Sequence, residues 1–486
     1  AEDGIRDVER SRGLGDVYKR QRMTSDSLNN QNNIFPTSSG SNESLLILLN
    51  RTSEIICKWF SDSDKLGPIP IDSNFECSVP GEQGKSFDVL FSEIESLIYS
   101  SFNPVHPGSL AHLDPPPLII SILGDLIAAG LNNNLLAHEL SPSVSLLEES
   151  ICKWFSIKLG FSDLAGGVAA SGGTLSNLNA LVTARNYAGL ETDSKAVYLI
   201  SEDAHSSFEK CTRIMGLEKN NLIKVKTDKD GCMDMIELKK TVDKCSIEGK
   251  RIFAIVATLG TTVRGAIDPI DNISKFCNER NIWLHIDGSI GGIFSITNIK
   301  INGIINVHLA NSITINPQKI LGITKTSSLL IVSNIEILKN TFSTGLPYVS
   351  NENNSFNRGE LGIQGSRPAE IIKLWLGLRF LGMRGIEDVL NSSIKRRIFF
   401  ENNLDRYKYD LYSGPLHIIS FLPKGMNKNE SDSWTLKKRI NLLKKNFMIS
   451  RPLFKNRYYL RAVFGNYNTS ESHINDLLKL LNYYES

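Results

Sequence analysis

The stretch NSITINPQKILGITKTSSLLIV, residues 311–332, decides the expected fold. Two apolar, β-branched runs, SITI and SSLLIV, flank a short polar connection that holds Pro317 and Lys319. Such runs favour strands, so the pattern predicts two buried strands with a lysine between them. A desolvated lysine has a lowered pKa and can form a Schiff base with an aldehyde cofactor. Taken alone, however, a segment of this kind is more often a surface turn with a solvated lysine.

From residue 166 to residue 332 the sequence alternates between apolar runs and helical patterns. The predicted strands upstream of the opening stretch are AVYLI (196–200), LIKVK (222–226), RIFAIVAT (251–258) and IWLHI (282–286). Strands that alternate with helices predict a mainly parallel α/β sheet, whose ligands lie at the carboxyl ends of the strands. The segment 166–177, GGVAASGGTLSN, is interpreted as a glycine loop that opens a helix.

The bulk composition is that of a globular protein without a bias toward polyanions or membranes. The chain has 486 residues, of which 41% are hydrophobic and 22% charged, with a net charge of +2. This balance gives no electrostatic reason to expect a nucleic acid or membrane partner. The longest apolar stretch, residues 118–131, contains Asp125 and is too short to span a bilayer. Seven scattered cysteines without a CxxC pair predict reduced thiols, a cytoplasmic protein and no bound metal.

The sequence predicts three folded regions after a leader. Residues 1–22 resemble a translated adaptor sequence and are excluded from the expected fold. A helical N-terminal arm is expected over 23–110, with helices near 44–60 and 87–102, followed by a large α/β domain over 111–370. Residues 371–486 are expected to form a smaller C-terminal α+β domain.

The segment ASGGTLSN, residues 170–177, could hold an anion. Gly172 and Gly173 would let the backbone approach a ligand, and Thr174 adds a hydroxyl group. The start of the helix supplies unpaired N–H groups and the positive end of the helix dipole. The alternative, a glycine-rich helix cap with no ligand, is about equally frequent for this motif alone.

Two polar residues follow predicted strands and are candidates for chemistry. His205 lies after the strand AVYLI, where its ring could stack on another ring or move a proton. Asp287 ends the run IWLHID, and a buried carboxylate beside a pyridine nitrogen would keep that nitrogen protonated. His285 points to the same side by strand alternation and is interpreted as a supporting residue.

Four motifs in this order resemble one enzyme family. ASGGTLSN, HSSFEK (205–210), HIDGSIGG (285–292) and NPQK (316–319) resemble the pyridoxal-phosphate amino-acid decarboxylases, which include the glutamate, aromatic-amino-acid and diaminobutyrate enzymes. The loop ATLGTTVRGAIDPI (257–270) and the segment HLDPPP (112–117) fit the same pattern. The resemblance implies the fold-type I architecture, a pyridoxal 5'-phosphate cofactor, an amino-acid substrate, and a homodimer with its active site at the subunit interface.

The resemblance also implies roles for individual residues. Lys319 would bind the cofactor aldehyde, Asp287 would pair with the ring nitrogen, and His205 would stack on the ring. Tyr348 would return a proton to the substrate. The implied cofactor-binding residues are Gly172, Gly173, Thr174, His205, Thr261, Asp287, Asn316 and Lys319, and the implied substrate-binding residues are Asn132 and Arg367.

The chain departs from the family pattern at Gln318, where a histidine usually precedes the lysine. It also has Gly288 and Ser289 in place of the usual alanines, and one arginine, Arg367, where relatives often have two. The expected reaction is decarboxylation of an L-amino acid to an amine and CO2, and the HLDPPP and ELSP motifs favour a diaminobutyrate-like substrate. The alternatives are an aldehyde synthase or aminotransferase on the same scaffold, and a cofactor-binding homologue without activity, which Gln318 would favour.

Overall fold

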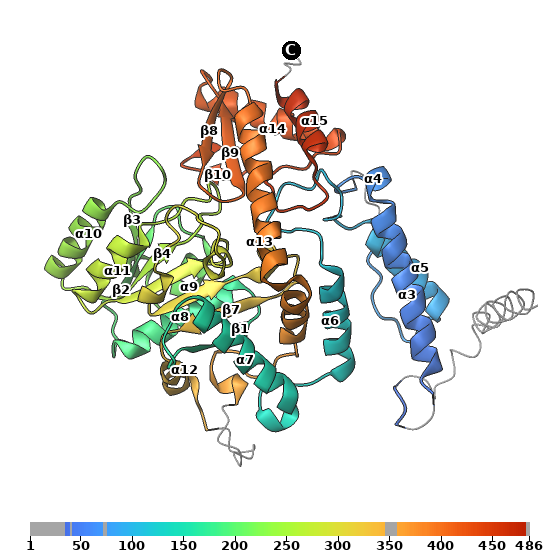
Figure 1. Cartoon of the computed structure of the whole chain (residues 1–486), viewed down its shortest axis with the longest axis horizontal. Coiled ribbons are helices and arrows are strands. Elements are labelled where there is room, and N and C mark those ends of the chain that lie inside the picture. Colours follow the sequence, from blue (N-terminus) through green and yellow to red (C-terminus); the bar gives the residue numbers. More distant parts are fainter. Residues whose placement is uncertain (1–34, 39–40, 71–74, 346–356, 483–486) are drawn as a thin grey trace, which may run out of the picture. The chain divides into compact units, whose positions relative to one another are not determined.

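The structure is a computed structural model that describes residues 35–38, 41–70, 75–345 and 357–482. It divides into two compact units, residues 1–106 and 107–486 (Figure 1). The expected leader, residues 1–22, and Tyr348 lie outside the described residues.

The first unit consists of helices that pack on one another. They are α3 (Glu43–Ser61), α4 (Ser63–Leu66) and α5 (Phe87–Tyr99). The Arg51 guanidinium on α3 donates a hydrogen bond to Asp88 at 2.8 Å and lies 4.2 Å from the centre of the Phe91 ring on α5. The two arm helices expected from the sequence are therefore confirmed.

The second unit is built on a seven-stranded sheet with the order β1-β7-β6-β5-β4-β2-β3. Its strands are β1 (Gly166–Ala170), β2 (Ala196–Ser201), β3 (Leu222–Val225), β4 (Arg251–Thr258), β5 (Trp283–Gly288), β6 (Ser312–Ile315) and β7 (Ser328–Val332). The strands β2 to β6 pair in parallel, whereas β7 runs antiparallel to both β6 and β1. The expected mainly parallel α/β sheet is confirmed.

Helices cover both faces of this sheet (Figure 1). The helices that contact its strands include α7 (Pro142–Lys158), α8 (Gly173–Tyr187), α9 (Ser207–Ile214), α10 (Met235–Ile247) and α11 (Ile270–Asn278). Further out, α12 (Ile335–Phe342) packs on α8, and α6 (Ile119–Leu131) packs on the long α13 (Ile371–Asn403). Alternate residues of β2 enter different apolar clusters: Tyr198 packs with Phe208 of α9, while Val197 packs with Val242 of α10. The sheet is therefore buried on both sides, as a parallel sheet requires.

The strand β1 was not expected from the sequence. The interpretation of GGVAA as a loop was wrong because glycine and alanine are depleted in strands and give no local signal. Here tertiary packing decides the conformation. A Cβ atom at Gly167 would lie 2.3 Å from the carbonyl oxygen of Leu330 on β7, so the close pairing of the two strands requires glycine.

The C-terminal part of the second unit is a small α+β layer. Its antiparallel sheet has the order β12-β9-β8, formed by β8 (Tyr409–Ser413), β9 (Ile418–Pro423) and β12 (Leu460–Val463), with a separate hairpin of β10 (Leu453–Phe454) and β11 (Arg457–Tyr458). Helices α14 (Lys428–Lys444) and α15 (Glu471–Asn482) accompany it. Because α13 begins at Ile371, we propose that the boundary between the large and the small domain lies between residues 370 and 371.

Candidate active site

A pocket of about 180 Å³ lies where the carboxyl ends of the parallel strands meet the start of α8. It contains most of the residues that the sequence singled out. Its lining residues are Gly173, Thr174, Asn177, His205, Ser207, Thr258, Gly260, Thr262, Asp287, Ser289, Ile290, Asn316, Gln318 and Lys319. Such a position is where open α/β sheets bind their ligands.

Lys319 ends a short turn of 3-10 helix, Pro317–Lys319, that follows β6. Its backbone N–H donates to the carbonyl oxygen of Asn316 at 3.1 Å, which fixes the turn and aims the side chain into the pocket. Burial lowers the pKa of the Lys319 ammonium below its usual value, although Asp287 and Asp114 act in the opposite direction. A larger share of neutral amine makes Lys319 a better nucleophile.

Asp287 stands on β5 between two threonines of the neighbouring strands. The register pairs it with Thr258 of β4 and with Thr314 of β6, so the three side chains share one face of the sheet. Burial alone would raise the pKa of Asp287, but the Lys319 charge and a hydrogen bond with the Ser289 side chain hold it below its ordinary value. Asp287 is therefore a buried carboxylate that remains ionised and can hold a proton on a facing nitrogen.

His205 follows β2, and a backbone hydrogen bond orients its ring. Burial lowers the pKa of its imidazole, although the nearby Asp287 acts against this shift. The backbone N–H of Ser207 donates to Nδ1 at 3.2 Å, so the proton of the neutral ring is on Nε2. The ring lines the pocket as a flat, uncharged surface with a donor at one edge.

The anion-binding segment is arranged around Gly173, the first residue of α8. Gly172 has a φ of +95°, which glycine tolerates, and it turns the chain into the helix. A Cβ atom at Gly173 would lie 2.7 Å from both Asn316 Nδ2 and Ser289 Oγ, so this glycine leaves room for a close approach of polar groups. Thr174 lines the pocket beside them. The donors fit a phosphate group at the helix start.

In the loop after β4, Thr262 lines the pocket beside the expected Thr261, whose role in cofactor binding stays a prediction. Thr261 Oγ1 accepts the N–H of Ala266 at 3.0 Å, so this hydroxyl stabilises its own loop. The next residue, Thr262, lines the pocket, and its carbonyl oxygen accepts a hydrogen bond from Arg461 at 2.8 Å. Residue spacing alone could not distinguish the two threonines, because the turn decides which side chain faces inward.

His285 lies behind the pocket and supports it. Its ring nitrogens are 2.9 Å from Ser312 Oγ and 3.1 Å from Asn177 Oδ1, and the ring is fully buried. Burial lowers the pKa of His285 to about 4, so it is neutral at physiological pH. The sequence missed Asn177, although it closes the ASGGTLSN motif and lines the pocket. It also missed Thr258, which ends β4 beside Asp287.

Asn132 and Arg367 line a second pocket of about 490 Å³. Neither residue lines the Lys319 pocket. Asn132 caps α6 with a left-handed backbone, and the Arg367 guanidinium binds the buried Glu148 carboxylate at 2.5 and 2.6 Å. Glu148 also accepts from Arg358 Nε at 3.0 Å. A role of Asn132 and Arg367 in binding substrate stays a prediction.

Replacing Glu148 with glutamine is expected to destabilise the second unit by about 3–5 kcal/mol, because it leaves two buried guanidinium groups without a counter-charge. Burial alone would raise the pKa of Glu148, but Arg367 and Arg358 lower it overall. This stabilisation is therefore present above the carboxyl's ordinary pKa of 4.5 and is lost as the pH falls through the lowered value. Urea unfolding measures the effect, with the exposed neighbour Glu149→Gln as control. Equal unfolding midpoints for Glu148→Gln and the wild type would contradict it.

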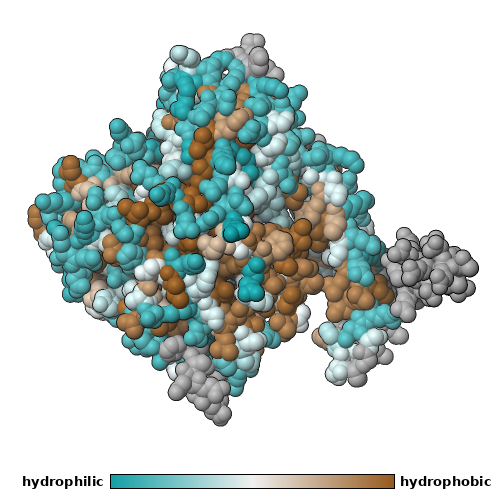
Figure 2. All heavy atoms as spheres, in the orientation of Figure 1, coloured by the Kyte–Doolittle hydropathy of each residue, from teal (hydrophilic) through white to brown (hydrophobic). Residues whose placement is uncertain are grey.

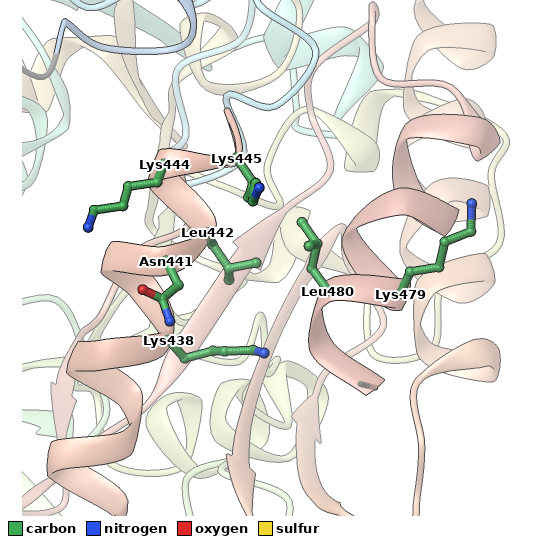
Figure 3. Close-up of a pocket in the computed structure, with 7 residues that line it drawn as sticks. All are labelled: Lys438, Asn441, Leu442, Lys444, Lys445, Lys479 and Leu480. Atoms are coloured by element: carbon green, nitrogen blue, oxygen red, sulfur yellow. The ribbon is translucent and has the colours of Figure 1, made fainter. Parts of the chain in front are cut away.

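A groove between α14 and α15 is a second place that could attract an anion (Figure 3). Leu442 and Leu480 face each other across it, and its rim carries Lys438, Lys444, Lys445 and Lys479. The lining residues described there include no carboxylate and no buried lysine. The groove therefore lacks a carboxylate that could hold a protonated ring and a buried lysine with a lowered pKa, so a phosphorylated ring fits the Lys319 pocket better.

Metal binding is not suggested by the described part of the chain, in which no group of three or more His, Cys, Asp or Glu side chains could hold an ion. None of the described helices is both long and apolar enough to cross a membrane.

Comparison with known proteins decides the family. The family model described as "Pyridoxal-dependent decarboxylase conserved domain" matches residues 72–409. The chain belongs to this family. It is a pyridoxal-phosphate-dependent amino-acid decarboxylase, and the residues of the Lys319 pocket fit that cofactor.

Individual relatives agree with this assignment. The chain is 30% identical over 369 residues to acidic amino acid decarboxylase GADL1 of Xenopus tropicalis, covering 71% of this chain and 70% of the relative. It is 28% identical over 323 residues to aromatic-L-amino-acid decarboxylase of Bacillus atrophaeus, covering 65% of this chain and 67% of the relative. Among solved structures, mouse CSAD has a TM-score of 0.84 at 22% identity, covering 91% of this chain and 99% of that one. The last comparison confirms the expected fold class.

Proposed function

We propose that the Lys319 pocket is the catalytic centre at which this decarboxylase removes the α-carboxyl group of an L-amino acid. The observation that supports this assignment best is the combination of a lysine with a lowered pKa, an ionised buried aspartate and an anion-binding helix start in one pocket. Catalytic sites typically hold ionisable groups whose pKa values are shifted by their environments, as this lysine and this carboxylate are.

The roles of the residues follow from their environments. Bound pyridoxal phosphate supplies an electron-accepting ring that takes up the electron pair left when CO2 departs. Asp287 would keep the ring nitrogen protonated, Lys319 would hold the cofactor aldehyde, and the start of α8 would hold the phosphate.

The α-carbon must regain a proton after CO2 leaves. His205 can donate from Nε2, because its Nδ1 accepts the Ser207 N–H. Tyr348, which lies outside the described residues, is the other candidate that the resemblance suggests. If either side chain donates a proton to the α-carbon, the product is an amine.

Product analysis tests the function. Purified protein loaded with pyridoxal phosphate should release CO2 and amine in equal amounts from its preferred L-amino acid. Aldehyde with ammonia would favour the aldehyde-synthase alternative, and keto acid without CO2 would favour the aminotransferase. Cofactor binding without any product across all the amino acids offered would favour an inactive homologue.

We further propose a diaminobutyrate-like substrate. The segments HLDPPP (112–117) and ELSP (139–142) support this choice. Relatives of this chain are named for acidic and aromatic substrates as well, so a panel of acidic, aromatic and basic L-amino acids is the appropriate test. The highest kcat/KM should belong to 2,4-diaminobutyrate; a higher value for glutamate or an aromatic amino acid would contradict the choice.

We propose that the protein works as a homodimer with the active site at the subunit interface. Helix α6 supports this, because Ile119, Leu123, Leu126, Ile127 and Leu131 are exposed although apolar. Figure 2 shows hydrophobic side chains gathered over this part of the second unit. Large exposed apolar patches commonly mark protein interfaces.

Replacing Leu123 with glutamate is expected to shift the protein from dimer toward monomer and to lower its activity in parallel, because a charge would be buried in the interface. Sedimentation measures the mass, which should change from twice 54.0 kDa toward 54.0 kDa. Leu436→Glu on α14 is the matched control, since its exposed fraction of 45% is close to the 46% of Leu123. A wild-type protein that sediments as a monomer would contradict the dimer.

We also propose a cytoplasmic location. All seven cysteines are free, and several of them, including Cys152 and Cys277, are buried. Free thiols are typical of reducing compartments.

A further inference from the structure

Gln318, the residue that departs from the family pattern, has a fixed orientation. Its Oε1 accepts the backbone N–H of Ser327. A backbone N–H can only donate, so the oxygen of the amide must face Ser327. The Nε2 group therefore points away from Ser327, and Gln318 lines the Lys319 pocket. Its amide nitrogen has no acceptor among the described residues.

Asn316 is oriented by the same part of the chain. Its Oδ1 accepts a hydrogen bond from Ser328 Oγ at 2.6 Å, and Ser328 Oγ is also 2.8 Å from Ser176 Oγ on α8. The Nδ2 group of Asn316 lies against Gly173, and only 3% of Asn316 is exposed. Like Gln318, Asn316 has its oxygen bound to the protein and no described acceptor for its nitrogen.

Two consecutive residues, Ser327 just before β7 and Ser328 at its start, thus orient two amide groups of the Lys319 turn. Both Gln318 and Asn316 line the pocket, and the Asn316 Nδ2 group lies against Gly173 at the start of α8. The backbone N–H groups of Gly173 and Thr174 have no acceptor in the described part of the chain either. An anion in the pocket could accept hydrogen bonds from these unpaired donors, as anions do at helix N-termini.

No permanent cation accompanies these donors. Among the lining residues of the pocket, Lys319 and His205 are the only side chains that can carry positive charge. Burial lowers the pKa of His205, which disfavours its charged form, and Lys319 is needed for the aldehyde. The anion must therefore be held by neutral amides, hydroxyl groups and the helix dipole.

Given the proposed role of the Lys319 pocket, we propose that Gln318 is a cofactor-binding residue whose Nε2 donates to the phosphate, together with Asn316, so that phosphate binding needs no titrating side chain. A histidine at this position would hold the phosphate more strongly when protonated and less strongly when neutral. Gln318 replaces that pH-dependent contact with one that does not change with pH.

The test compares the affinities of the apo-protein for pyridoxal phosphate and for pyridoxal, which lacks the phosphate. The ratio of these affinities isolates the phosphate contacts, because the titration of Lys319 affects both ligands equally. Gln318→Leu should lower the ratio by about tenfold to a hundredfold, since a hydrogen bond to a charged group is lost. Gln318→Glu keeps an oxygen for Ser327 but places a carboxylate against the phosphate, so it should lower the ratio further.

The pH dependence provides a second readout. Between about pH 7 and pH 9 the phosphate stays doubly charged, so the wild-type ratio should stay constant within about twofold. Gln318→His should make the ratio fall with rising pH as the imidazolium loses its proton. Thermal unfolding of each apo-variant should match the wild type.

Several results would overturn the inference. An unchanged ratio in Gln318→Leu would show that Gln318 does not contact the phosphate, and a raised KM without loss of cofactor affinity would place it at the substrate instead. A pH-independent ratio in Gln318→His would likewise contradict the contact. These outcomes leave the proposed function intact, because that function is tested separately by the amine formed by wild-type protein.

Discussion

Replacing Lys319 with alanine is expected to abolish multiple turnover, with kcat falling by at least about a thousandfold. Lys319 combines two tasks that no other described residue of the pocket combines. It supplies an amine whose lowered pKa favours attack on the cofactor aldehyde, and it can accept or donate a proton beside Asp287. Alanine removes both, while the anion-binding donors around Gly173 remain.

The measurement is steady-state amine formation together with the absorption spectrum of the loaded protein. The variant should still bind pyridoxal phosphate through its phosphate, but without the visible band of lysine-bound cofactor. Lys325→Ala is a suitable control, because Lys325 lies on the same connection but pairs with Asp114 and is half exposed. Multiple turnover by Lys319→Ala at more than a tenth of the wild-type rate would contradict the assignment.

Replacing Asp287 with asparagine is expected to lower kcat by roughly 10²- to 10⁴-fold with little change in fold. The substitution keeps an oxygen that can accept the Ser289 N–H, which Asp287 accepts at 3.2 Å. It removes the negative charge that keeps the facing ring nitrogen protonated, so the ring becomes a weaker electron acceptor. The flanking Thr258 and Thr314 would remain, yet neutral hydroxyl groups cannot replace that charge.

The loss should appear mainly in kcat, because the substrate would still be bound. Asp287→Glu provides a comparison that retains the charge but shifts its position. Cofactor affinity and kcat of Asp287→Asn are measured in parallel, and a kcat within about fivefold of the wild type would contradict the role of Asp287.

The sequence could predict the position of the site because the residues of strands carry a strong local signal. The runs that became β2, β5 and β6 are apolar and β-branched, and the carboxyl ends of parallel strands meet at one edge of a sheet. His205, Asp287 and Lys319 each follow one of these runs. Their meeting in one pocket is therefore a direct consequence of the strand pattern.

Features that depend on packing between distant segments could not be predicted in the same way. Gly166–Ala170 forms β1 because it fits closely against β7, and nothing in GGVAA indicates a strand. Thr262 faces the pocket, while Thr261 turns into its own loop. Arg367 binds Glu148, a partner 219 positions away along the chain.

Gln318 illustrates how a departure from a family pattern can acquire a physical meaning. In the sequence it was only the residue that stood in place of a histidine. In the structure, the Ser327 N–H fixes the orientation of its amide and directs a donor toward the pocket. Gln318 thus places a hydrogen-bond donor at this position, where a protonated histidine would place a positive charge.

Mapping the lysine that holds the cofactor tests the central claim most directly. The loaded wild-type protein is reduced with borohydride, which fixes the cofactor to the amine that binds it, and the modified peptide is identified by mass spectrometry. The account predicts one modified residue, Lys319. Modification of Lys438 or another lysine of the α14–α15 groove, or of no lysine at all, would contradict it.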